Sequence, residues 1–72
     1  MSLGEFNQIS AGMSHDQVAE IVGSPGQLSV DRDVAGFHDT IYTWSGCGGL
    51  GANANVQFQD DAEVTKAQAG LG

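Results

Sequence analysis

The sequence predicts an α+β domain: a two-helix N-terminal hairpin packed on one face of a four-stranded antiparallel β-meander. Helix-start signals occur twice near the N-terminus, the hydrophobic period changes after Pro25, and residues 53–59 alternate polar and apolar side chains throughout. A chain of 72 residues leaves room for one domain. We therefore expect a single unit over residues 1–72, with residues 1–3 as candidates for vector-derived additions.

The stronger helix-start signal lies at Ser14. The Ser14 hydroxyl can accept from the amide three residues on, and the Gln17 side chain can return to the Ser14 amide, which makes a capping box. The helix should begin at His15, carry one apolar stripe, and stop at Gly23 ahead of Pro25.

A weaker copy of this signal precedes it. Ser2 and Glu5 have capping-box spacing, and Gly12 stands where a left-handed C-cap residue is expected. The sequence therefore predicts two short helices joined by a tight turn over residues 11–13.

After Pro25 the pattern is that of strands. Leu28 and Val30 alternate with polar neighbours, and Asp60 with Asp61 supplies turn chemistry between the last two strands. The four expected strands lie around residues 28–31, 40–44, 53–59 and 64–68.

The third strand indicates how the sheet is oriented. Ala54, Val56 and Phe58 are expected to face the helices, which places the alternate polar residues, Asn55 and Gln57 among them, on the solvated face. The second strand has two orientations. In one, Tyr42 and Trp44 are exposed and Ile41 points inward with Thr43; in the other, the aromatic side chains fill the core and Ile41 lies outside.

Composition excludes several classes of partner. Nine acidic residues against Arg32 and Lys66 give a formal charge of -7, which repels nucleic acid and anionic lipid. One cysteine cannot form an internal disulfide, and with two histidines it makes a poor zinc set. No apolar run approaches the roughly 20 residues that span a bilayer, and no segment resembles a signal peptide.

Motifs that resemble catalytic or metal sites fail on geometry or completeness. Residues 14–16 contain Ser, His and Asp, but adjacent helix positions point apart. Residues 46–51 match a dinucleotide-binding glycine pattern that leads into a strand instead of a helix. Residues 31–36 begin like a calcium loop but lack its later ligands. Cys47 could act as a nucleophile only with a base beside it, and the spacing places neither His38 nor another base there. We expect no catalytic residue, no metal and no cofactor, and hence no enzyme.

Two longer patterns carry a family resemblance. They are Phe6-x-x-Ile9-x-x-Gly12-Met13-Ser14-x-x-Gln17-Val18 with Ile21-Val22-Gly23, and Val64-Thr65-Lys66-Ala67-Gln68 near the end. Together they resemble one repeat of the secreted β-lactamase inhibitory protein, and more closely the small envelope lipoproteins with that fold. The outer-membrane assembly lipoproteins of the SmpA/OmlA type share the plan more distantly.

The resemblance implies that the sheet face away from the helices binds a partner. Tyr42 matches a partner-facing position, Lys66 matches a contacting lysine, and Trp44 would follow Tyr42. With Asn55 and Gln57 around them, these five residues form the predicted partner-binding site. Residues 46–52 lack the acidic and aromatic side chains with which the inhibitor occupies its target's active site.

The sequence thus favours a non-catalytic protein-interaction module, extracellular or in the cell envelope, with a protein partner. Any membrane contact would come through a lipid anchor outside this chain. One alternative is an inhibitor of a β-lactamase or a cell-wall peptidase. A second is a self-associating structural domain, in which edge strands of two copies pair as a homodimer.

Overall fold

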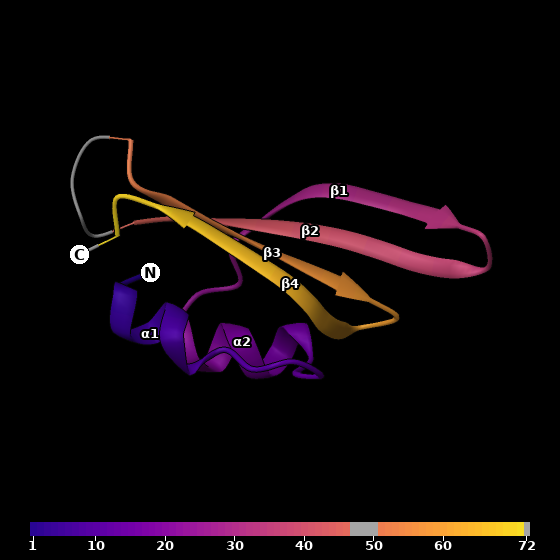
Figure 1. Ribbon diagram of the computed structural model, residues 1–72, viewed down its shortest axis with the longest axis horizontal. Coiled ribbons are helices and arrows are strands. Elements are labelled where there is room, and N and C mark those ends of the chain that lie inside the picture. The colour runs from indigo at the N-terminus through magenta and orange to yellow at the C-terminus, as the bar shows by residue number, and fades with distance from the viewer. Residues whose placement is uncertain (47–50, 72) are drawn as a thin grey trace.

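Two short helices and a four-stranded antiparallel sheet make up the fold. The structure is a computed structural model that describes residues 1–46 and 51–71. The elements are α1 (Leu3–Gln8), α2 (His15–Val22), β1 (Gln27–Val34), β2 (Phe37–Ser45), β3 (Asn53–Gln59) and β4 (Ala62–Ala69), and the strands follow in the order β1-β2-β3-β4. Both helices lie along one face of the sheet, and the β1–β2 hairpin extends past them (Figure 1). The predicted class and element order are confirmed.

Both capping boxes form. The amide of Gln17 donates to Ser14 Oγ at 3.2 Å and the amide of Ser14 donates to Gln17 Oε1 at 2.9 Å, so α2 begins at His15 as predicted. Gly23 then ends α2 with a φ of 87°. The described residues contain no helix that is long and apolar enough to cross a membrane.

The end of α1 differs from the prediction. Ser2 and Glu5 cap its start reciprocally, but α1 ends at Gln8, and its C-cap is the extended residue Ile9, three residues before Gly12. Gly12, with a φ of 88°, lies instead in the turn between the helices. This turn is bound to the sheet, because the amide of Gly12 donates to the Glu63 carbonyl at 3.0 Å and the amide of Glu63 donates to the Met13 carbonyl at 2.8 Å.

The core lies between the helices and the helix-facing side of β2 and β3. Val18 from α2 and Val56 and Phe58 from β3 are fully buried, as the alternation of β3 predicted. The buried core as a whole comprises Met1, Phe6, Ile9, Val18, Trp44, Ala54, Val56 and Phe58. Burial of these apolar side chains is the main source of stability in a chain of this size.

The family resemblance favours the orientation of β2 in which Tyr42 and Trp44 are exposed, and this orientation is wrong. In the register Tyr42 lies opposite Val56 and Trp44 opposite Ala54, so both aromatic side chains share the helix-facing side. Trp44 is 2% exposed, and its indole N–H donates to the Ser24 carbonyl at 2.9 Å. Tyr42 is half-buried.

Each edge strand contains a register shift. The pairing of β1 with β2 shifts at Ser29, so Leu28 is paired with Tyr42 on the helix side whereas Val30 is paired with Ile41 on the opposite side. The simple alternation predicted for Leu28 and Val30 therefore does not hold. A second shift lies at Val64 on β4, between the pairs made by Thr65 and Glu63.

Candidate functional site

The candidate site is the sheet face that the helices leave uncovered (Figure 1). Because side chains alternate along a strand, the register assigns the same face to every second residue of neighbouring strands. We call this surface the open face. Its centre consists of Asp39, Ile41 and Thr43 of β2 with Asn55, Gln57 and Gln59 of β3, flanked by their cross-strand partners on β1 and β4.

A chain of hydrogen bonds crosses one end of the open face. Thr43 Oγ1 donates to Asn55 Oδ1 at 2.8 Å, and Ser29 Oγ lies 2.8 Å from Thr43 Oγ1. Since the single hydroxyl proton of Thr43 goes to Asn55, the Ser29 hydroxyl is the donor to Thr43, which is nearer to it than the Gln27 carbonyl at 3.5 Å. These hydrogen bonds fix the position of the Asn55 side-chain oxygen. The NH2 group of Asn55 takes no part in them and has a defined direction.

An apolar position lies next to this polar chain. Ile41 is half-buried and stands between Val30 on β1 and Gln57 on β3, its direct partners in the register. Val30 and Gln57 are half-buried as well. An apolar centre with polar neighbours is the arrangement typical of protein-binding surfaces.

A carboxylate is the third feature of the open face. Asp39 is 9% exposed, although no helix covers its side of the sheet, and its Oδ1 accepts no hydrogen bond from any residue that the structure describes. Its cross-strand partners are Arg32 on β1, which is exposed, and Gln59 on β3, which is half-buried.

The five predicted partner-binding residues do not form one surface. Asn55 and Gln57 lie on the open face, whereas Tyr42, Trp44 and Lys66 lie on the helix-facing side, because all three are paired with buried apolar positions of β3. Whether any of the five contacts a partner stays a prediction. The expected exposure of Trp44 is wrong.

Lys66 has a structural role in α1. Its Nζ donates to the carbonyls of Phe6 and Ile9 at 2.8 and 2.9 Å, and lies 4.5 Å from the centroid of the Phe6 ring. A cation at the C-terminal end of a helix satisfies carbonyls that have no partner within the helix. Lys66 therefore holds α1 against β4.

His15 links α2 to the aromatic side chains. Its ring stacks on Tyr42 with centroids 3.8 Å apart, and its Nε2 lies 2.8 Å from the Pro25 carbonyl. The backbone amide of His15 donates to Asp61 Oδ1 at 3.1 Å. Ser14 uses its hydroxyl as a helix cap and His15 places its ring nitrogen on the Pro25 carbonyl, so the two adjacent side chains have separate structural contacts.

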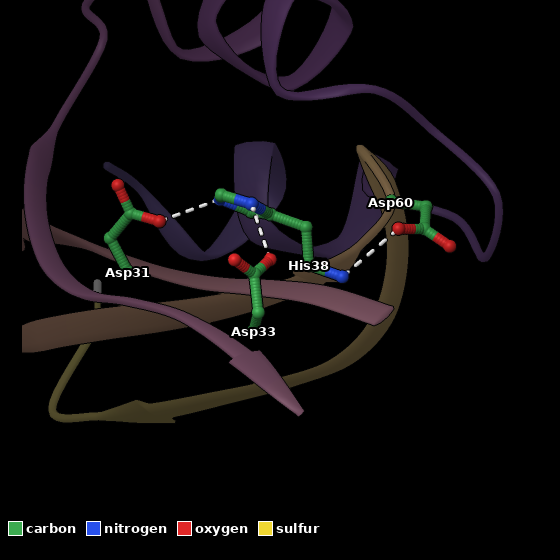
Figure 2. Close-up of polar contacts among 4 residues, drawn as sticks. All are labelled: Asp31, Asp33, His38 and Asp60. Atoms are coloured by element: carbon green, nitrogen blue, oxygen red, sulfur yellow. Dashed lines mark hydrogen bonds and ion pairs between the residues drawn. The ribbon is translucent and has the colours of Figure 1, made fainter. Parts of the chain in front are cut away.

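A second polar cluster lies at the far end of the sheet, on the helix-facing side (Figure 2). His38 Nε2 is 2.6 Å from Asp31 Oδ1, and His38 Nδ1 is 3.1 Å from Asp33 Oδ1. The amide of His38 donates to Asp60 Oδ1 at 3.0 Å. Both ring nitrogens can donate together only in the imidazolium form.

This cluster does not have the form of a metal site. Among the described residues, no three His, Cys, Asp or Glu side chains are gathered closely enough to hold a metal ion. Asp31 and Asp33 belong to β1, as expected for a strand end rather than a calcium loop. Cys47, which was considered with His38, lies outside the described residues.

The comparison with known families identifies the fold. The model of the β-lactamase inhibitor (BLIP) family matches residues 2–72. The chain belongs to the BLIP family. No curated protein and no solved structure matches it. The BLIP match agrees with a protein-binding, inhibitor-like module, and it does not test the likeness to envelope lipoproteins.

Sequence reasoning missed Asp39, Ile41 and Thr43 as members of the open face. The signal that could have found them is the alternative orientation of β2, in which the aromatic side chains fill the core and Ile41 lies on the outer face. Asp39 then follows from alternation, but its burial and its unpaired oxygen do not, because they depend on contacts between strands.

Proposed function

We propose that this BLIP-family chain is a non-catalytic module that binds a target protein through the open face. The observation that supports this most is the uncovered sheet surface, where Asn55 is held by a hydrogen-bonded chain next to the half-buried Ile41. Such a preorganised surface loses little side-chain entropy on binding. Tyr42, Trp44 and Lys66 then act indirectly, by holding the sheet and the helices together.

The family match gives the first class of target to test. A β-lactamase is that target, with cell-wall peptidases as the alternative. Inhibition is a separate property, because residues 46–52 contain no acidic or aromatic side chain to enter an active site. We therefore expect binding to be measurable whether or not hydrolysis is blocked.

A secreted or cell-envelope location would bring the module to such targets. This proposal comes from the family resemblance. Sequencing the precursor gene upstream of residue 1 tests it: a signal peptide, with or without a lipidated cysteine, is expected, and a leaderless cytoplasmic open reading frame would contradict it.

The binding experiment uses two sets of variants. Immobilised chain is exposed to a panel of purified β-lactamases and cell-wall peptidases, and turnover of a chromogenic substrate is followed in parallel. Ile41→Lys and Asn55→Arg on the open face should each weaken binding by at least about tenfold, because they place a new cation at the centre of the contact. Glu20→Lys, an exposed change on α2 that also adds a cation, is the control and should bind as the parent chain does.

Equal loss in the control and open-face variants would contradict use of this face. Self-association is examined by light scattering of the same samples over a concentration series. We expect a monomer, because register shifts at Ser29 and Val64 interrupt both edge strands, and interrupted edges pair poorly with another sheet.

A further inference from the structure

The Asp39 carboxylate has an unusual environment for a folded protein. The side chain is more than nine-tenths buried, and its Oδ1 has no hydrogen-bond donor among the described residues. Buried carboxylates almost always have donors, since burial removes the water that would otherwise solvate the charge. Such an unmade hydrogen bond weakens the free protein.

The cations of the chain itself do not fill this gap. The sequence has two Lys or Arg residues, and Lys66 is bound to α1 carbonyls on the other side of the sheet. Arg32 stands directly opposite Asp39 in the register and is exposed, yet it does not donate to Asp39 Oδ1.

Apolar side chains lie on the same face, toward the tip of the β1–β2 hairpin. Val34 and Phe37 are paired across the two strands and are 44% and 47% exposed. Phe37 is two residues from Asp39 on β2, so the two side chains lie on the same side of the sheet. A carboxylate beside exposed apolar groups suits a lysine or arginine, whose methylene stem packs on apolar surface while its charged end seeks an anion.

We propose that Asp39 is the specificity-determining residue of the open face and receives a lysine or arginine side chain of the target protein. This inference rests on the proposed function, which it deepens by naming the chemistry of the partner. The net charge of -7 favours the approach of a basic surface over long range. Because Asp39 Oδ1 is closed to solvent in the free chain, neighbouring side chains move aside when the complex supplies the missing donor.

The other carboxylates are weaker candidates for this role. Asp33 is 80% exposed, and both Asp31 and Asp33 lie beside His38. Exposed carboxylates keep their water, so a cation that binds there gains little free energy. Asp33 is for this reason a suitable matched control.

The first test uses a small probe and needs no identified partner. N-acetyl-arginine methylamide is titrated into the 15N-labelled chain, with the uncharged N-acetyl-citrulline methylamide as the reference compound. We expect the arginine probe alone to shift the amide signals of Arg32, Asp39 and Gln59. Asp39→Asn should weaken its binding about tenfold through loss of a charge-assisted hydrogen bond, and Asp33→Asn should leave it within about twofold. Shifts centred on His38, or equal effects of the two variants, would overturn the assignment.

A second variant examines access to the carboxylate. Arg32→Gln removes the like charge that faces an incoming cation, so it should tighten binding of the arginine probe by about threefold. Weaker binding would mean that Arg32 helps to hold the site together and would count against the proposal.

Stability gives an independent readout. Asp39→Asn keeps the shape of the side chain and removes a buried, unpaired charge, so its thermal midpoint should equal or exceed that of the parent chain. A lower midpoint would show that Asp39 has a structural partner, and the proposal would fail. A target panel without any binder would instead contradict the proposed function, while the probe titration would still report on Asp39.

Discussion

Gly26 and Trp44 are in close contact where the chain enters the sheet. A Cβ built on Gly26 would lie 2.6 Å from Trp44 Cε2 and 2.8 Å from Cδ2, and Gly26 has a φ of +70°. Only glycine combines this backbone conformation with so close an approach to a ring. The buried position of Trp44 therefore depends on a residue 18 positions earlier in the sequence.

We predict that Gly26→Ala destabilises the fold by about 2–4 kcal/mol, through left-handed strain together with displacement of the indole. Gly23→Ala is the matched control, because Gly23 has a similar φ of +87° with nothing near the added Cβ. It should cost about 1 kcal/mol. Urea unfolding followed by the fluorescence of Trp44, the single tryptophan, measures both. Equal losses would mean that Gly26 makes no special contact with the ring.

At the scale of elements, the β3–β4 turn joins three parts of the fold. Asp60 and Asp61 both have positive φ, which aspartate tolerates better than most residues. The Asp60 carboxylate accepts from the amide of His38 in β2, and the Asp61 carboxylate accepts from the amide of His15 at the start of α2. The turn thus caps a helix as well as reversing the chain.

A pair of glycine substitutions separates these two roles. Asp61→Gly relieves the positive φ but removes the cap on α2, so we predict a net loss of about 1 kcal/mol in the free energy of unfolding. Ala35→Gly, in the β1–β2 turn, relieves a φ of 52° in an exposed residue and should stabilise by up to about 1 kcal/mol. Chemical denaturation of both variants tests the difference in sign; stabilisation by Asp61→Gly would show that the cap contributes little.

The helices and strands could be predicted from local signals. The features that were not predicted depend on pairing between strands. The capping box at Ser14 and the alternation of β3 depend on neighbours in sequence, and both were predicted correctly. The side of the sheet occupied by Trp44 depends on its register with Ala54, and the shift at Ser29 changes the side of all preceding residues of β1. The roles of Lys66 and Asp39 depend on contacts with distant strands and helices, which no short pattern encodes.

At the scale of the whole molecule, negative charge opposes folding. The net charge is -7, and three of the nine acidic residues, Asp31, Asp33 and Asp60, lie around His38 (Figure 2). Asp61 follows Asp60 in the same turn. Their mutual repulsion is present in the compact state and weaker in the expanded unfolded chain. Salt screens such repulsion between exposed charges, with a Debye length of about 10 Å at 0.1 M.

We therefore predict that raising NaCl from about 20 mM to about 300 mM increases the thermal midpoint by a few degrees, since about 0.5 kcal/mol corresponds to roughly 2–4 °C in a domain of this size. The variant carrying Glu20→Gln and Asp33→Asn lowers the magnitude of the charge at two exposed positions. Its midpoint at low salt should be higher and its response to salt smaller. Differential scanning calorimetry measures both quantities. If the parent chain and the variant respond equally, salt acts through apolar burial, and charge repulsion is not what limits the stability of this fold.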